Sequence, residues 1–270
     1  MAVPIELERM KVGELDMGYA LMGEGPPLVL ILGMTATVDW WPLELLASIG
    51  QKYRLLVFDN RGAGTTTGGT EGNYTVPQMA DDTVGLMKAL GLDKAHVLGW
   101  SMGGMIAQEM ALNHPEAVDK LVLCATYCNG RECVRPTKEN MKILVDRTGT
   151  TAEMAGRICR LMLSTEWLET HPEFVQVFID RYTIAPTTDE NATKQFMATV
   201  DFAACDRLSE LKVETLVACG SDDIVIPAEN SRLIAKLIPN ARLVEFEGGG
   251  HAFMYEQLDA FREMLFDFLA

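Results

Sequence analysis

Residues 95–104 read AHVLGWSMGG and contain the pattern Gly-x-Ser-x-Gly, centred on Ser101. The serine lies between the run Ala95–Leu98, which is typical of a buried strand, and the helical pattern Met102–Asn113, which ends before a His-Pro pair. Glycines two positions on either side allow the strained strand-to-helix turn that exposes a serine hydroxyl above a sheet. The alternative is a tight turn in which Ser101 only caps the helix. The placement favours a nucleophilic serine.

Short apolar runs alternate with helical patterns along most of the chain. Runs rich in Val, Leu and Ile with little polar alternation are typical of a parallel sheet that is covered by helices on both faces. A hairpin within residues 4–20 precedes them. The predicted strands are Leu28–Leu32, Arg54–Phe58, Ala95–Leu98, Lys120–Cys124, Thr215–Cys219 and Ala241–Phe246.

Helix signals complete the α/β pattern. Thr75 and Gln78 have the spacing of a capping box, and Gly91 stands where a glycine ends a helix. The pattern Met254–Leu269 carries one apolar stripe and predicts a last helix that packs on the sheet.

The alternation stops between Cys128 and Leu211, where helical patterns follow one another without a predicted strand. We therefore expect a helical cap over residues 128–211, inserted into an α/β core formed by residues 1–127 and 212–270. The predicted cap helices include Lys138–Arg147, Ala152–Leu163 and Glu173–Tyr182.

Charge and hydropathy argue against several classes of partner. The 270 residues carry 23 Lys and Arg against 38 Asp and Glu, a net charge of −15, and no dense basic run. We therefore expect no binding to nucleic acid or to an anionic membrane. No apolar stretch near the start approaches the roughly 20 residues of a membrane helix, and no secretory signal is visible, so we expect a cytoplasmic protein. The sequence makes no prediction of the oligomeric state.

The six cysteines are spread through the chain, and we expect them to be free thiols. Cys124, Cys128 and Cys133 lie close together in sequence, but no CxxC pair and no neighbouring histidine accompany them, so we expect no metal site. Glycine-rich nucleotide motifs and the H-E-x-x-H zinc motif are absent, so we expect no cofactor.

A serine hydroxyl needs a base beside it and a third group that orients the base. His251 follows three glycines after a predicted strand, at the end of the sheet where α/β sites gather. The orienting acid is expected among Asp222 and Asp223, after the strand Thr215–Cys219, because the strand that ends at Cys124 is followed by no carboxylate before Glu132. The other histidines stand in a strand, at a helix end and in the insertion: His96, His114 and His171.

The chain order Ser, Asp, His is that of one particular fold. The sequence resembles the α/β-hydrolase superfamily, specifically its capped serine esterase, lactonase and cofactor-free haloperoxidase-like members. The resemblance covers nearly the whole chain outside the insertion. Its landmarks are Gly33, Asp59–Gly64, the Ser101 turn, Gly220…Asp223…Pro227 and Gly250–His251.

The resemblance implies residue roles. The family pattern G-x-x-D-x-x-x-P places the acid on Asp223 rather than Asp222. It implies an oxyanion hole formed by the backbone N–H groups of Met34 and Met102. Leu32 stands where many members have histidine, although the backbone amides that hold the oxyanion do not depend on it.

Residues around these landmarks are expected to support the site. Asp59 and Arg61 should brace a loop beneath it. Several large apolar side chains predict an apolar pocket wall. They are Met34, Trp40, Trp100, Met102 and Met254.

Together these features predict a serine hydrolase for a small-molecule ester-like substrate. The expected reaction is hydrolysis of carboxylic esters with small to medium neutral acyl groups through an acyl-enzyme. Lactone opening, C–C bond hydrolysis and haloperoxidase-like perhydrolysis use the same triad and remain open. A ligand-binding receptor on this fold is the alternative from another class. A preference for anionic substrates would instead indicate a basic residue that faces the pocket, such as Arg131, Arg157 or Arg160.

Overall fold

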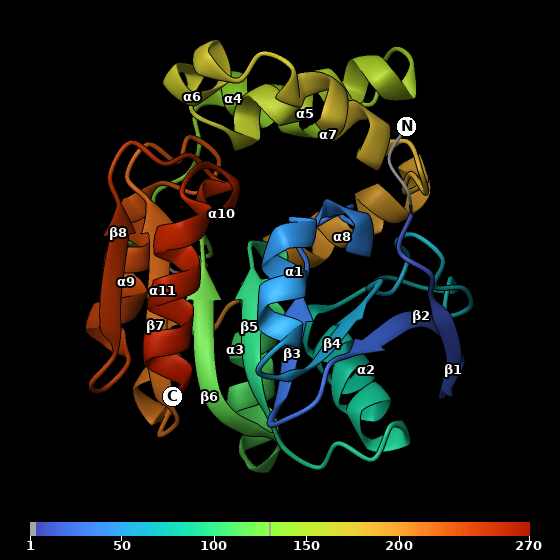
Figure 1. Ribbon diagram of the computed structural model, residues 1–270, viewed down its shortest axis with the longest axis vertical. Coiled ribbons are helices and arrows are strands. Elements are labelled where there is room, and N and C mark those ends of the chain that lie inside the picture. The colour runs from blue at the N-terminus through green and yellow to red at the C-terminus, as the bar shows by residue number, and fades with distance from the viewer. Residues whose placement is uncertain (1–3, 130) are drawn as a thin grey trace.

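The computed structural model describes residues 4–129 and 131–270, and its framework is an eight-stranded sheet. The strands are β1 (Glu8–Val12), β2 (Leu15–Met22), β3 (Pro27–Ile31), β4 (Arg54–Phe58), β5 (Ala95–Trp100), β6 (Val118–Cys124), β7 (Glu214–Gly220) and β8 (Arg242–Phe246). Their order is β1-β2-β4-β3-β5-β6-β7-β8, antiparallel from β1 to β4 and parallel from β4 to β8 (Figure 1). The predicted, mostly parallel sheet is confirmed.

Helices cover both faces of the sheet. The α-helices of the structure, of which α4 to α8 belong to the insertion, are α1 (Leu43–Gly50), α2 (Val76–Ala89), α3 (Met102–Asn113), α4 (Lys138–Val145), α5 (Thr151–Met162), α6 (Thr165–Thr170), α7 (Phe174–Tyr182), α8 (Asp189–Asp201), α9 (Ala228–Leu237), α10 (Phe253–Glu256) and α11 (Leu258–Leu269). Because side chains alternate along a strand, Leu28 and Leu30 of β3 enter one apolar core and Val29 and Ile31 enter the other. The first core packs α1 and α11, and the second packs α2, α3 and α9.

Two predicted helix details differ from the structure. The Thr75 hydroxyl accepts the Gln78 N–H at 3.2 Å, but the Gln78 side-chain oxygen has no partner among the described residues, so only half of the capping box forms. The predicted last helix is interrupted at Gln257, whose φ of −131° and ψ of 51° separate α10 from α11. The Gln257 amide instead donates to Glu247 O at 2.8 Å, which ties the interruption to the loop after β8.

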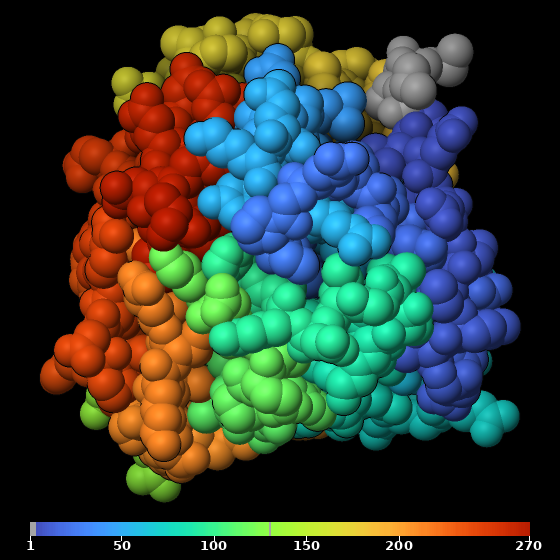
Figure 2. Space-filling model, turned by 60° about the horizontal axis from the view of Figure 1, so that its bottom comes forward, coloured from blue at the N-terminus to red at the C-terminus, as the bar shows by residue number. Residues whose placement is uncertain are grey.

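Five α-helices, α4 to α8, lie between β6 and β7, and the described part of residues 128–211 contains no strand. In Figure 1 the yellow-green helices α4 to α7 lie beyond the carboxyl ends of the parallel strands. Figure 2, which brings the opposite end forward, shows these helices behind the core segments. The helical insertion is therefore placed over the end of the sheet where the predicted site residues lie, and the domain limits at 128 and 211 stay a prediction.

The expectation of six free thiols is wrong for Cys128 and Cys205, which form a disulfide across 77 residues. The chain returns from α8 to the loop after β6, where the N–H groups of Ala204 and Cys205 both donate to Cys128 O at 2.9 and 3.3 Å. This return brings the two Cα atoms to 4.8 Å, within the range that a disulfide needs. The disulfide joins the start of the helical insertion to its end.

Candidate active site

Ser101 stands at the turn between β5 and α3 with φ of 59° and ψ of −122°. Its side chain makes no capping hydrogen bond, so the alternative of a simple helix cap is wrong. The flanking glycines are required by close approach, because a Cβ atom on Gly99 would lie 2.2 Å from Gly103 O and one on Gly103 would lie 2.1 Å from Ile31 O. The backbone is therefore held in a strained conformation that presents the hydroxyl to the space above the sheet.

His251 and Asp223 come from the loops after β8 and β7 and meet in a buried pair. Asp223 Oδ2 lies 2.7 Å from His251 Nδ1, and both side chains are at most 1% exposed. Asp223 Oδ1 accepts the N–H groups of Val225 and Ile226 at 2.8 Å each. Three hydrogen bonds thus fix both oxygens of this carboxylate.

Asp222, the other candidate acid, does not face the histidine. It is exposed, and its Oδ1 accepts a hydrogen bond from the Ser221 hydroxyl at 2.8 Å. The geometry therefore favours Asp223 over Asp222 as the partner of His251, the position that the family pattern G-x-x-D-x-x-x-P implied.

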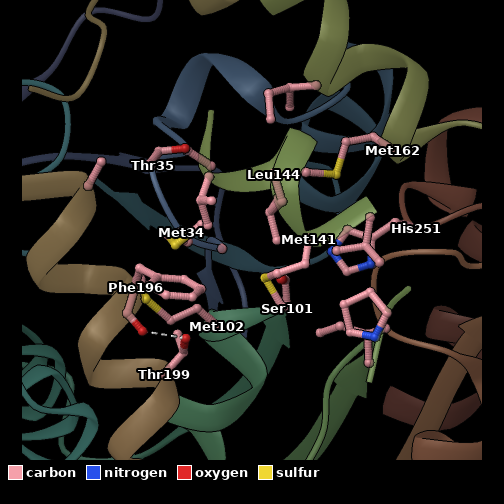
Figure 3. Close-up of a pocket in the computed structure, with 18 of the residues that line it drawn as sticks. Met34, Thr35, Ser101, Met102, Met141, Leu144, Met162, Phe196, Thr199 and His251 are labelled. Carbon is pink, nitrogen blue, oxygen red and sulfur yellow. Dashed lines mark hydrogen bonds between the residues drawn. The ribbon is translucent and has the colours of Figure 1, made fainter. Parts of the chain in front are cut away.

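The second ring nitrogen of His251 is free to act as a base. With Nδ1 donating to the carboxylate, Nε2 carries a lone pair, and this buried atom has no hydrogen-bond partner in the described part of the chain. His251 and Ser101 line one cavity, and Figure 3 shows their side chains beside each other. The Trp100 indole donates to His251 O at 3.0 Å and holds the loop in place.

Met34 and Met102 line the same cavity (Figure 3). Met102 begins α3, so its N–H has no acceptor within the helix. Met34 lies in the turn after β3, and its N–H donates to no residue that the structure describes. Two backbone donors are therefore available beside Ser101.

The cavity has a volume of about 400 Å³ and is mainly apolar. The predicted wall residues Met34, Trp40, Trp100 and Met102 line the cavity. The prediction for Met254 is wrong, because this residue of α10 is fully buried and does not line the cavity. Sequence reasoning missed the wall residues from the insertion, whose only signal was the apolar spacing of its helices. They include Met141, Leu144, Ile158, Met162 and Phe196.

Asp59 and Arg61 brace the loops beneath the site, as predicted. Asp59 accepts the N–H groups of Val38 and Thr65 at 2.9 and 2.8 Å, and burial raises the pKa of Asp59 although these hydrogen bonds oppose the shift. Arg61 makes two hydrogen bonds of 2.8 Å to Asp82. Neither residue lines the cavity.

Within the described residues, one group of side chains is close enough to share a metal ion: Cys128, Cys133 and Cys205, with sulfur atoms within 4.8 Å of one another. Since Cys128 and Cys205 form the disulfide, only Cys133 keeps a thiol there. Burial raises the pKa of Cys159 and of Cys219, elsewhere in the fold, to about 11, so these thiols stay protonated at neutral pH.

No helix in residues 4–129 or 131–270 has the length and apolarity to cross a membrane.

The chain is similar to several known hydrolases. The chain is 29% identical over 264 residues to a protein of Azorhizobium caulinodans named "Putative carbamate hydrolase RutD", covering 95% of this chain and 96% of the relative. A hydrolase from Pseudomonas aeruginosa has a similar structure, with a TM-score of 0.85, 27% identity and 98% of each chain covered. The enol-lactonase from Burkholderia xenovorans has a TM-score of 0.83 and 25% identity over 97% of this chain and 99% of its own. Residues 26–149 and 154–258 match the model of the alpha/beta hydrolase fold, and the chain belongs to this family.

Proposed function

We propose that this α/β hydrolase is a serine hydrolase that cleaves carboxylic esters through an acyl-enzyme. Ser101 is the nucleophile, His251 the base and Asp223 the group that orients the base. The observation that carries the proposal is the buried His251, held by Asp223 at 2.7 Å, with its free Nε2 in the same cavity as Ser101.

The chemistry follows from these positions. His251 Nε2 takes the Ser101 proton while Oγ attacks the ester carbonyl, and the Asp223 carboxylate stabilises the imidazolium that forms. The N–H groups of Met34 and Met102 donate to the oxyanion. His251 then returns the proton to the leaving alcohol, and water repeats the same steps to release the acid.

The cavity supports a neutral acyl group of small to medium size. Its volume of about 400 Å³ suits a small ligand, and its wall is built mainly from methionine, leucine, valine and aromatic side chains. A neutral acyl chain loses little hydration energy on entering such a wall, whereas an ionised group loses much.

Carbamate or lactone hydrolysis is the second candidate. It is supported by the relative named as a carbamate hydrolase and by the similar structure of an enol-lactonase. The same nucleophile, base and oxyanion donors serve either acyl carbon. Parallel kcat/KM measurements on a matched aryl ester, aryl carbamate and lactone rank the three substrates.

Replacement of the nucleophile tests the proposal. Ser101→Ala should lower kcat on an activated aryl ester by at least about 10⁴-fold, because the attacking oxygen is lost while substrate binding remains. Circular dichroism and thermal unfolding should match the wild type. A serine-directed fluorophosphonate should label the wild type at Ser101 and leave the variant unlabelled. Retention of most activity in Ser101→Ala would refute the proposal, and tight ligand binding without turnover in the wild type would favour a receptor.

A further inference from the structure

Gln195 on α8 is a fully buried polar side chain that connects the helical insertion to the loop after β3. Its Oε1 accepts the N–H of Thr35 at 2.8 Å, and its Nε2 donates to Arg61 O at 2.8 Å. The side chain is 0% exposed. Both ends of the amide are therefore used, and both hold backbone of the α/β core.

Thr35 directly follows Met34, whose N–H is the proposed oxyanion donor. Thr35 has a φ of 62°, in the left-handed region that a β-branched residue adopts only when its surroundings hold it there. Its carbonyl oxygen accepts the Thr187 hydroxyl at 3.1 Å. The segment 187–195 thus holds Thr35 at its N–H and at its C=O.

The rest of the turn has few other supports. Asn60 Nδ2 donates to Leu32 O at 2.9 Å, and Ala36 N donates to Gly33 O at a long 3.4 Å. The Leu32 side chain is apolar and offers the turn no hydrogen bond. Of these contacts with residues 32–36, the one from Gln195 to the Thr35 N–H is the shortest, at 2.8 Å.

We propose that Gln195 is a positioning residue for the oxyanion hole. By holding the Thr35 N–H, it fixes the Met34–Thr35 peptide and so limits the rotation of Met34, whose own N–H is the proposed oxyanion donor. A donor must lie about 2.7–3.1 Å from the developing oxyanion, and an error near 1 Å can cost about 100-fold in rate. This inference rests on the proposed serine hydrolase function.

The same helix also supplies part of the cavity wall. Phe196 and Thr199 of α8 line the same cavity as Met34 and Thr35 (Figure 3). Seating of α8 therefore determines both the contact with the acyl chain and the direction of an oxyanion donor. Through Gln195, catalysis depends on the position of the insertion, which otherwise only supplies side chains that line the cavity.

Gln195→Met tests the proposal, because methionine has a similar length and makes neither hydrogen bond. We expect kcat on an activated ester to fall about 10- to 100-fold while KM changes less than about threefold. Affinity for a trifluoromethyl ketone, whose adduct with Ser101 places an oxyanion in the hole, should fall by a similar factor. Hydrogen exchange of a peptide that contains Thr35 should become faster.

Gln108→Met is the matched control. Gln108 is also 0% exposed, and its amide donates to Gly104 O and Tyr127 O rather than to the turn after β3. We expect this variant to lower the Tm while kcat stays within about twofold.

The outcomes separate the two proposals. If the wild type shows no Ser101-dependent turnover, the proposed function fails and this inference fails with it. If the wild type is active and Gln195→Met keeps its kcat, or if Gln195→Met and Gln108→Met lose kcat and Tm in parallel, only the positioning role of Gln195 is overturned.

Discussion

Asp223→Asn changes a single atom of the candidate site, and the surrounding contacts determine how the new amide lies. Asp223 Oδ1 accepts two backbone N–H groups, from Val225 and Ile226, at 2.8 Å. An amide NH₂ turned toward them would leave buried donors facing donors, at a cost of about 1–3 kcal/mol each. The asparagine oxygen therefore keeps this position, and its nitrogen faces His251 Nδ1.

The expected loss follows from the tautomer of the histidine. Asparagine nitrogen donates to His251 Nδ1, so the ring proton moves to Nε2, and this nitrogen can no longer accept the proton of Ser101. The same change in serine proteases that use a Ser-His-Asp triad lowers kcat by about 10⁴-fold. That factor corresponds to a rise of about 5.5 kcal/mol in the activation free energy. We expect a loss of this size for Asp223→Asn.

Asp222→Asn is the matched control, since Asp222 is adjacent, exposed and bonded to Ser221 instead of His251. Steady-state hydrolysis of an activated aryl ester, with thermal unfolding as a check of folding, measures both variants. Asp222→Asn should retain kcat within about twofold, as expected for a surface substitution. The reasoning is refuted if Asp223→Asn keeps more than about a tenth of kcat, or if the large loss appears in Asp222→Asn.

Two further predictions concern stability. Reduction of the Cys128–Cys205 disulfide, which spans 77 residues, should lower the free energy of unfolding by up to about 4.5 kcal/mol on the chain-entropy model. The unfolding of the double variant Cys128→Ser/Cys205→Ser should not respond to reductant. Detection of six reactive thiols in denaturant without reductant would contradict the disulfide. Burial lowers the pKa of His96 below its ordinary 6.5, although the nearby Asp119 charge opposes this, so below pH 6.5 the unfolded chain binds the proton more readily than the folded one. The contribution of His96 to the free energy of unfolding should therefore rise with pH up to about 6.5 and then level off. The difference in slope between wild type and His96→Gln in urea titrations measures this contribution, and equal slopes would contradict it.

Local signals in the sequence were sufficient for most of the sheet and for α3. The strand Arg54–Phe58 and the helix Met102–Asn113 have the predicted limits. The strand is one arginine followed by four apolar residues, and the His-Pro pair after Asn113 ends the helix. By contrast α8 was not predicted, although Thr188 supplies its N-cap. Its mean hydropathy is low, and only packing against the core reveals which of its faces is buried.

Long-range contacts account for what sequence reasoning missed at the site. Gln195 bonds Thr35 across 160 residues, and Cys128 bonds Cys205 across 77. No spacing rule links such positions, since each contact depends on how the insertion returns to the core. The serine, acid and histidine of the candidate site were easier to predict because each follows a strand of one parallel sheet, and the carboxyl ends of those strands meet at one edge.

The charge of the cavity also depends on the return of the insertion. Arg131, Arg157 and Arg160, the basic residues that the sequence suggested, do not line the cavity, whereas Arg135 and Arg147 do. Arg147 already donates to Asp189 at 2.8 Å. Arg135 is exposed, its guanidinium donates to Asn129 Oδ1 and lies over the Tyr127 ring, and no ion pair with a carboxylate is found for it among the described residues. Arg135 is therefore the lining cation without a carboxylate partner in the described chain that a substrate carboxylate could approach.

We nevertheless expect a neutral ester to be hydrolysed with a higher kcat/KM than its carboxylate-bearing analogue. An exposed ion pair with Arg135 contributes about 0–1 kcal/mol, whereas transfer of a carboxylate into an apolar wall costs several kcal/mol. The neutral ester should be favoured by about 10-fold or more, and Arg135→Gln should change this ratio by no more than about fivefold, which corresponds to 1 kcal/mol. A chain-length series of neutral aryl esters with one terminal carboxylate analogue measures the ratio. A preference for the anionic ester that disappears in Arg135→Gln would show that the guanidinium outweighs the desolvation of the carboxylate, and that the apolar wall does not select the substrate.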